Sequence, residues 1–443
     1  MPSAHRRARG RLLAAAGLLL IAALTLVPHP EALAFAERTP IWCLVCGNLG
    51  AIDVLFNVVL FVPYGAGLRL AGLSRRRLLA LVLATTLAVE MLQYTIITGR
   101  DASLSDVLTN TTGGLLGALA VPVVAQLLAP GPRLRRVLLG GWTALWLGLL
   151  ALTALSERRA LPRSTYYGQY AADFAGFARF RGAVLEARVD ARPIPGRRLS
   201  PAEGAAVRAA LLADSVTIEA TAVTAGPPGG ENPHGVAPIF SIFDEHQREI
   251  VMLAQQEGDL FLRLRTRAAA FRVRTPMALR LPRAIADSGD TVRLAGTYAH
   301  GRLRLALAGP GGERGTELVL TPSLGWAMLL PFEYIPGPDY RAPTMAWLFV
   351  MLVPLGYWGR RRAAAGESRA LPLLAAALGI AGPALVARAF GLPAPAWWEW
   401  AAAAAGAAAG RLLAGWCART RRRRPAPPLV TAVTALPPRR QRT

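Results

Sequence analysis

The feature that most constrains this chain is a series of long apolar runs, each close to the length that crosses a lipid bilayer. A transmembrane helix needs about 20 mostly apolar residues, because each residue adds about 1.5 Å along the axis of a helix. Hydrophobic residues make up 53% of the 443 residues and charged residues only 17%, which is an apolar balance for a soluble protein. We therefore predict a membrane α-helical bundle of about eight spans, at residues 11–28, 52–72, 78–97, 106–129, 137–155, 342–358, 370–390 and 397–417.

The distribution of charge indicates how these spans are oriented. The chain has 50 basic residues against 27 acidic ones, and the net charge of +23 would also suit a nucleic-acid-binding protein. The arginines, however, gather in short segments beside the apolar runs: Arg6, Arg7, Arg9 and Arg11; Arg69 and Arg75 to Arg77; Arg133, Arg135 and Arg136; Arg360 to Arg362 and Arg369; and eight between Arg419 and Arg442. With the N-terminus in the cytoplasm, every cluster falls on the cytoplasmic side, as the positive-inside rule expects. We expect a multi-pass protein of the cytoplasmic membrane with both termini in the cytoplasm and no nucleic-acid partner.

The same count divides the chain into four parts. They are an N-terminal membrane domain of five spans (1–155), an extracytoplasmic domain (156–341), a C-terminal membrane domain of three spans (342–418), and a disordered basic cytoplasmic tail (419–443). The first run is also compatible with a cleaved signal peptide, because small residues follow it at Ala32, Ala34 and Ala36. Its apolar core is longer than a usual signal region, which favours an uncleaved anchor.

Between Glu157 and Arg341 the pattern changes from long apolar runs to short alternating ones. Strands are predicted at 184–189, 215–220, 239–243, 249–254, 260–264, 292–298 and 303–307. Ala299-His300-Gly301-Arg302 reads as the turn of a hairpin between the last two. Many short, regularly spaced strands predict an inserted all-β domain of the jelly-roll or sandwich type.

The β region resembles the laminin-G-like or concanavalin-A-like jelly rolls in the segments 217–220, 239–244, 258–266 and 292–298. The resemblance implies a sandwich that often binds glycans, sometimes with calcium, and it transfers no site residue. Asp244 and Asp259 are candidates to lie near a metal, but the usual cluster of several oxygen ligands is not visible. We therefore predict no metal site and leave calcium in the β domain open.

A second group of residues stands out because polar side chains inside a membrane span are costly and commonly functional. The candidates occur near the outer ends of three consecutive spans and in the loop between two of them: Asn57, Glu90, Gln93, Arg100, Asp106 and Asn110. From the expected topology, Asn57, Glu90 and Asn110 lie within roughly 10 Å of the outer membrane boundary. Gly113 and Gly117 continue the helical face of Asn110 and would let a neighbouring helix approach closely.

These residues resemble the VanZ-like membrane family. The matching run is Glu90-x-x-Gln93, Arg100, Asp106-x-x-x-Asn110-x-x-Gly113-x-x-x-Gly117, preceded by Asn57 and by Leu60-Phe61-x-Pro63-x-Gly65. The resemblance covers about residues 50–130. The founding member of the family is linked to teicoplanin resistance, and the resemblance implies no defined reaction.

Three interpretations of the polar residues remain open. The amides and Glu90 can hydrogen-bond between helices and serve only the structure of the bundle. Alternatively, they can hold a lipid headgroup or glycolipid, with Arg100 on a phosphate and the acid and amides on sugar hydroxyls. In the third interpretation, Glu90 and Asp106 are the acid–base pair of an intramembrane enzyme, although no nucleophile accompanies them and we assign no catalytic residue.

Cys43 and Cys46 form a C-x-x-C pattern in the first outer loop. In an oxidising envelope this pair could form a disulfide, whereas a redox role would need a thioredoxin-like setting that is missing. We expect a small structural loop, bridged or not.

Our leading hypothesis is a non-enzymatic protein of the cell envelope that needs no cofactor. Its VanZ-like bundle would engage a lipid or lipid-linked glycan at the outer leaflet, and its external domain would bind a cell-wall glycan or an envelope protein. A relation to glycopeptide resistance is a further expectation. The alternatives are an intramembrane enzyme acting on such a lipid and a structural or assembly factor.

Overall fold

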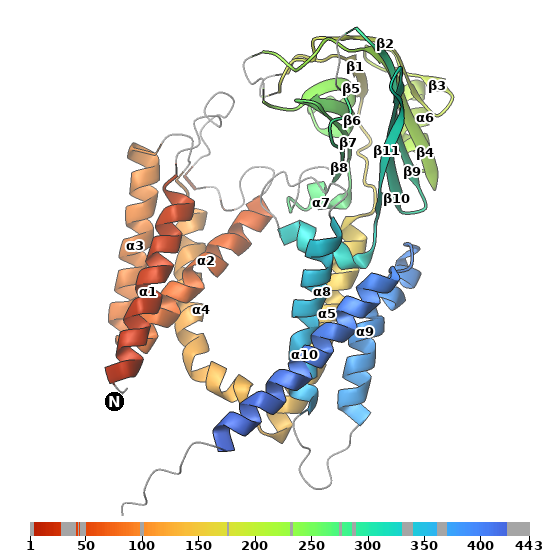
Figure 1. Cartoon of the computed structure of the whole chain (residues 1–443). Coiled ribbons are helices and arrows are strands. Elements are labelled where there is room, and N and C mark those ends of the chain that lie inside the picture. Colours follow the sequence, from red (N-terminus) through yellow and green to blue (C-terminus); the bar gives the residue numbers. More distant parts are fainter. Residues whose placement is uncertain are drawn as a thin grey trace, which may run out of the picture.

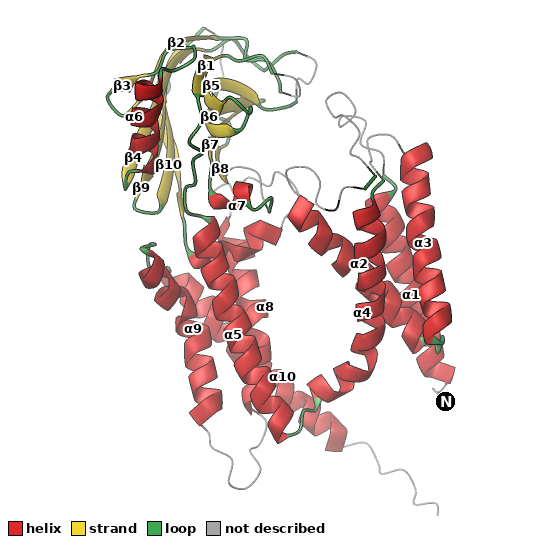
Figure 2. Ribbon diagram, turned by 180° about the vertical axis from the view of Figure 1, so that it is seen from behind, coloured by secondary structure: helices red, strands yellow, loops and turns green. Residues whose placement is uncertain are grey.

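The computed structural model describes residues 4–27, 41, 42, 44, 50–97, 102–174, 177–230, 234–273, 277–285, 289–329, 340–360 and 370–422. Long helices form two groups, and a β-sandwich stands above the second group (Figures 1 and 2). This is the helical membrane part with an inserted sandwich that the sequence predicts.

The N-terminal group contains α1 (Ala4–Thr25), α2 (Gly50–Leu70), α3 (Arg75–Thr95) and α4 (Leu104–Leu128). The C-terminal group contains α5 (Pro132–Ser156), α8 (Arg341–Arg360), α9 (Ala370–Phe390) and α10 (Trp397–Arg422). Within the described residues, seven helices are long and apolar enough to cross a membrane, and α10 is not among them. The eighth expected span is thus a helix of the expected extent but less apolar than the rest, because alanine and glycine replace larger aliphatic residues and Glu399 and Arg411 interrupt it.

Glycine determines how closely the helices of the N-terminal group approach each other. A methyl group on Gly113 would overlap the carbonyl oxygen of Val58, and one on Gly117 would overlap that of Val62. The backbones of α2 and α4 therefore touch along this face, as expected from the sequence. Gly10 and Gly67 allow the same approach between α1 and α2. Such contacts replace the hydrophobic driving force that helices lack within lipid.

Small residues also join α8 to α10. A methyl group on Gly356 would overlap the carbonyl oxygen of Ala407, and one on Gly410 would overlap that of Val353. On the other side of this group, α5 is held by its tryptophans: the Trp142 indole donates to the Met351 carbonyl oxygen at 2.8 Å and the Trp146 indole to that of Gly379 at 3.0 Å. The less apolar α10 is thereby packed into the bundle.

Hydrogen bonds near the end of α4 connect the two groups. The Tyr357 hydroxyl donates to the carbonyl oxygen of Leu128 at 2.7 Å, and the Trp358 indole donates to that of Leu127 at 3.0 Å. At the opposite end, the backbone N–H of Ala51 in α2 donates to the carbonyl oxygen of Arg272, just after the short helix α7 (Arg267–Ala270) of the sandwich domain, at 3.2 Å.

The sandwich consists of two antiparallel sheets, ordered β1-β5-β6-β7-β8 and β11-β10-β9-β4-β2-β3. The strands are β1 (Tyr166–Tyr170), β2 (Ala183–Val189), β3 (Arg192–Pro193), β4 (Ser215–Val223), β5 (Ala237–Asp244), β6 (Glu249–Gln256), β7 (Asp259–Leu264), β8 (Met277–Leu281), β9 (Thr291–Ala299), β10 (Arg302–Gly309) and β11 (Gly312–Val319). The seven expected strands correspond to β2, β4, β5, β6, β7, β9 and β10. The structure adds four strands at the sheet edges: β1, β3 and β8 are short, and β11 is mostly exposed, so none carries a long alternating pattern.

The sequence predicted one local feature of the sandwich, a hairpin turn, and missed another, a short helix. The β9–β10 hairpin turns at His300 and Gly301, whose φ angles are +46° and +78°, so the predicted turn is confirmed. The helix α6 (Pro201–Leu212) was missed by the all-β prediction, although Ser200 and Glu203 form a capping box around Pro201. Its residues Val207 and Leu211 are buried against the sandwich.

A 3-10 helix, η2 (Pro322–Leu329), leads from the sandwich towards α8. The side chain of Thr321, just before it, donates to Glu399 at the start of α10 at 3.2 Å. The Trp326 indole in η2 donates to Thr344 at the start of α8 at 2.9 Å. The sandwich is therefore anchored on the ends of the C-terminal helices.

Candidate functional site

Figure 1 shows that α3 ends, and α2 and α4 begin, at the end of the N-terminal group that is nearer the sandwich. The described polar residues singled out in these helices lie in the second half of α3 and in the first halves of α2 and α4. The Asn57 amide nitrogen in α2 donates to the Asp106 carboxylate in α4 at 2.5 Å. Asp106 is itself placed by the start of its helix, because its N–H donates to the hydroxyl of Ser103 at 3.1 Å, as in an N-cap. The first turn of α4 is therefore tied to the middle of α2.

Glu90 in α3 contributes to the same helix start. Its carboxylate accepts a hydrogen bond from the backbone N–H of Ser103 at 2.9 Å, and only 8% of the residue is exposed. A carboxylate that accepts from the N–H groups at a helix start is electrostatically favourable, because the N-terminal end of a helix carries partial positive charge. Glu90 and Asp106 thus meet at one point, the start of α4.

Gln93 and Asn110 each bond to a neighbouring helix. Gln93 donates to the backbone carbonyl oxygen of Thr25, the last residue of α1, at 2.9 Å. The Asn110 amide nitrogen donates to the Thr86 hydroxyl in α3 at 2.9 Å. Asn110 is only 3% exposed, and its side-chain oxygen is buried without a hydrogen-bond partner among the described residues. A buried acceptor of this kind costs free energy unless a further donor reaches it.

Some contributors were missed by the sequence analysis. Thr86 lies four residues before Glu90 and shares its helical face, so the spacing of the two residues could have revealed it. Thr25 contributes only a backbone carbonyl, which carries no sequence signal. Ser103 has the N-cap pattern Ser-x-x-Asp with Asp106, and this signal was available in the sequence.

The segment before α2 also reaches the start of α4. The backbone N–H of Leu104 donates to the carbonyl oxygen of Ile41, and the Ser105 hydroxyl donates to that of Leu44, both at 2.8 Å. Arg100, Cys43 and Cys46 lie outside the described residues. The predictions made for these three residues stay predictions.

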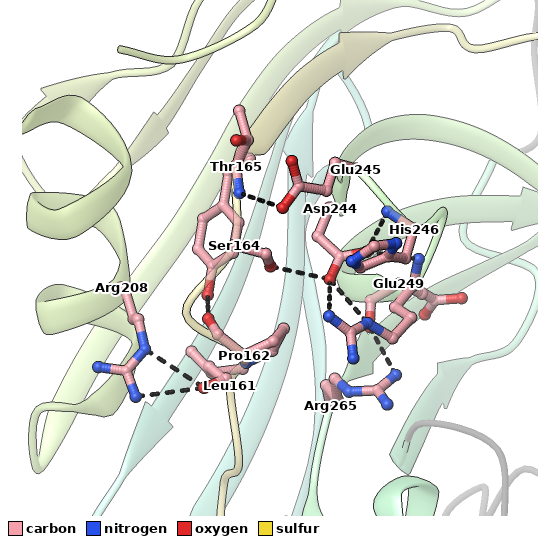
Figure 3. A network of polar contacts seen from close by, with 12 residues as sticks. Leu161, Pro162, Ser164, Thr165, Arg208, Asp244, Glu245, His246, Glu249 and Arg265 are labelled. Atoms are coloured by element: carbon pink, nitrogen blue, oxygen red, sulfur yellow. Dashed lines mark hydrogen bonds and ion pairs between the residues drawn. The ribbon is translucent and has the colours of Figure 1, made fainter. Parts of the chain in front are cut away.

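The two acids considered for a metal in the sandwich domain both have protein partners, and Figure 3 shows those of Asp244. Asp244 accepts hydrogen bonds from the Ser164 hydroxyl, from the N–H groups of His246 and Arg248, and from the Arg248 side chain, at 2.7 to 3.0 Å. Burial alone would raise the pKa of Asp244, but the bonds from Arg248 and Ser164 hold it below its ordinary value. Asp259 accepts from the N–H of Arg283 at 2.7 Å and pairs with Arg280.

The outer face of the six-stranded sheet carries a shallow groove of about 400 Å³. Alternating acids and arginines line it. The Arg293 guanidinium bonds both oxygens of Glu219 at 2.7 and 2.9 Å, and Arg188 pairs with Glu186 at 2.9 Å. Thr221 also lines the groove, and its hydroxyl donates to Glu186 at 3.4 Å. The groove is thus polar and close to neutral, and it presents both donors and acceptors.

The architecture defines the class of this protein: a multi-pass helical membrane protein with a β-sandwich inserted between two groups of helices. Its first four helices are VanZ-like, since residues 11–125 match the family described as VanZ/LLP1. The match runs from α1 into the last turn of α4 and includes the six polar residues of the candidate site. No curated protein and no solved structure matches the chain, so the likeness of the sandwich to laminin-G-like jelly rolls stays a prediction.

Proposed function

We propose that this chain is a non-enzymatic protein of the cytoplasmic membrane whose VanZ-like helices engage the headgroup of a lipid or lipid-linked glycan at the outer leaflet. The single observation that carries the proposal is the side-chain oxygen of Asn110, which is buried and has no hydrogen-bond partner among the described residues, beside the bonded groups of α2, α3 and α4. In this proposal the sandwich lies outside, both termini lie in the cytoplasm and α1 is an uncleaved anchor.

The distribution of arginine supports the proposed orientation. The start of α1, the turn between α2 and α3 and the ends of α8 and α10 carry arginine, and these helix ends lie on the side of the bundle opposite the sandwich (Figure 1). By the positive-inside rule, that side faces the cytoplasm. The candidate site is then near the outer surface, where headgroups and lipid-linked sugars are found.

The chemistry of the site suits hydroxyl-rich headgroups. A sugar or glycerol hydroxyl can donate to the side-chain oxygen of Asn110, and satisfying a buried acceptor is worth about 1–3 kcal/mol. Glu90 provides a further acceptor, and Arg100 in the adjoining loop would bind the phosphate. Similar hydroxyl chemistry fits the groove on the six-stranded sheet, where we propose that a cell-wall glycan or an envelope protein binds the ion pairs of Arg188 and Arg293.

Native mass spectrometry of the full-length protein, with its lipids retained, tests the binding proposal. We expect a co-purifying envelope lipid in the wild type and its loss in Asn110→Leu, which keeps the side-chain size and removes both polar atoms. The control is Thr112→Val on the same helix, because the exposed Thr112 hydroxyl bonds only to the backbone of its own helix. Failure to find any specific lipid in the wild type would refute the proposal.

An assembly or structural role is the second candidate, and a specific observation favours it. The amide nitrogens of Asn57, Gln93 and Asn110 all donate to a neighbouring helix, so much of the cluster serves contacts between helices. Under this alternative, Asn110→Leu would destabilise the bundle without changing the lipids that co-purify with it.

The enzymatic alternative, with Glu90 and Asp106 as an acid–base pair, is tested by substituting these two acids with their amides. Glu90→Gln and Asp106→Asn keep hydrogen-bonding groups but remove proton transfer. A glycopeptide-susceptibility phenotype of the wild-type gene that survives both changes would exclude acid–base catalysis, whereas its loss in both would favour an enzyme. The same assay tests the proposed relation to glycopeptide resistance.

A further inference from the structure

A second groove, of about 480 Å³, lies on the sandwich between α6, the segment 163–166 and the turn after β5. Figure 3 shows the segment with Ser164 and Thr165 running between Arg208 of α6 and the acidic turn that holds Asp244 and Glu245. The groove brings together three arginines from separate segments, with hydroxyl residues between them and a single acid: Arg163, Arg198, Arg208, Ser164, Thr165 and Glu245.

Among the described residues, the arginines of this groove lack the acidic partners that several other arginines of the domain have. Arg188, Arg197, Arg248 and Arg293 each pair with an acid. By contrast, no ion pair to Arg163, Arg198 or Arg208 occurs among the described residues. The groove therefore has an excess of positive charge that the protein does not neutralise.

Arg208 is held in place by a neutral group. Its Nε and one terminal nitrogen both donate to the backbone carbonyl oxygen of Leu161 at 3.2 Å. The neutral carbonyl does not balance the positive charge of the guanidinium. Because the side chain is already fixed in position, less side-chain entropy is lost when a ligand binds. Glu245, the acid that lines the groove, accepts a hydrogen bond from the N–H of Thr165 at 3.4 Å, and no ion pair joins it to these arginines among the described residues.

We propose that this groove binds a phosphate group, in a phosphodiester whose flanking glycerol or sugar reaches the hydroxyls. Several guanidinium groups around one concave site match a phosphate, whose oxygens accept forked hydrogen bonds from more than one arginine. A concave site with like charges also concentrates anions. The volume lies within the range of small-molecule sites, about 300–1,000 Å³.

Two sources of phosphodiester are within reach. Arg163 is seven residues beyond the end of α5, so it lies at most about 25 Å along the chain from the end of that span. A headgroup of the surrounding bilayer and a soluble or membrane-linked phosphodiester polymer present the same chemistry. The inference does not depend on the proposed site in the VanZ-like helices, because it concerns a different domain and different residues.

The test uses the full-length protein in phosphatidylcholine nanodiscs and a soluble oligo(glycerol phosphate), with binding measured by calorimetry. We expect saturable binding that weakens as salt rises. Arg163→Gln together with Arg198→Gln should weaken it about tenfold or more, because each charge-assisted bond is worth about 1.5–3 kcal/mol. These two side chains are exposed and form no ion pair within the described part of the chain, so the thermal stability should not change.

The matched control is Arg192→Gln together with Arg304→Gln, which removes two exposed charges from the same domain outside the groove. Equal weakening in both double variants, or no binding to the wild type, would overturn the proposal. Nanodiscs with one third phosphatidylglycerol separate the two sources. Weaker oligomer binding in these discs assigns the groove to lipid headgroups, and unchanged binding assigns it to a polymer-borne phosphate.

Discussion

At the scale of single residues, Glu90 is the side chain on which the VanZ-like helices depend most directly. Glu90 projects from α3, but its carboxylate accepts a hydrogen bond from the backbone N–H of Ser103. It therefore stabilises the first turn of a different helix, α4. A hydrogen bond of this kind needs an oxygen acceptor and not a charge. The role of Glu90 in the fold can therefore be separated from any role in proton transfer.

We predict that Glu90→Gln retains the stability of the wild type to within about 0.5 kcal/mol, because the amide oxygen still accepts from Ser103. Glu90→Leu should lower the free energy of unfolding by about 1–3 kcal/mol, since it leaves the half-buried N–H of Ser103 without this acceptor. Unfolding in mixed detergent micelles, followed by circular dichroism, measures both changes. A Gln variant as unstable as the Leu variant would show that the charge itself is required.

Asp244 is the comparable residue in the sandwich, where it closes the turn after β5. Asp244→Ala should destabilise the domain by about 2–4 kcal/mol at pH 7, because Arg248 and two backbone N–H groups lose their acceptor. Asp173→Asn is the control, since that exposed acid contributes only a long surface ion pair and should cost less than about 0.5 kcal/mol.

The same residue predicts a pH dependence. The pKa of Asp244 is lowered in the folded protein, so its carboxylate stabilises the fold above the unfolded pKa of about 3.9, and this contribution is lost as the pH falls through the folded pKa. The difference in melting temperature between the wild type and Asp244→Ala should therefore shrink between pH 5 and pH 2. A constant difference over this range would contradict the assignment.

At the scale of elements, glycine rather than large apolar residues determines which helices pair. We predict that Gly113→Ala disrupts the contact between α2 and α4, because the added methyl group would overlap the carbonyl oxygen of Val58. The control is Gly140→Ala in α5, where a methyl group meets nothing within 4 Å.

Only the first of the two alanine variants should lower the free energy of unfolding. Gly113→Ala should lower the free energy of unfolding by at least about 1–3 kcal/mol, as overpacking does, while Gly140→Ala should be neutral or stabilising by up to about 1 kcal/mol. Unfolding in mixed micelles compares them directly. Equal effects would mean that helix propensity, not the close approach of α2 and α4, controls stability at Gly113.

At the scale of the whole molecule, the sandwich and the arginine-rich helix ends lie on opposite sides of the membrane-spanning part. We predict that a cysteine in place of Arg304, on the sandwich, reacts with a membrane-impermeant maleimide on intact cells. A cysteine in place of Arg133, at the start of α5, should react only after permeabilisation. Both would be placed in a chain whose three native cysteines are replaced, and the reverse pattern would overturn the proposed orientation.

The sequence alone determined the features that depend on local composition. Apolar runs long enough to span a bilayer must form helices, because backbone groups cannot remain unpaired in lipid. The strong alternation of 215–220 and the His300-Gly301 turn likewise predicted β4 and the β9–β10 hairpin. Edge strands such as β11, which are exposed and weakly patterned, could not be found in this way.

Only the tertiary structure decided which polar groups meet. The expected topology placed Asn57, Glu90 and Asn110 at similar depth, but not their partners. Asn57 meets Asp106 of α4, Glu90 meets Ser103 at the start of α4, and Asn110 meets Thr86 of α3. The three arginines of the second groove, Arg163, Arg198 and Arg208, lie up to 45 residues apart, and no local pattern connects them. The physical reason is that local composition determines whether a segment is stable as a helix in lipid or as a strand in a sandwich. Contacts between distant segments depend instead on how the folded backbones pack.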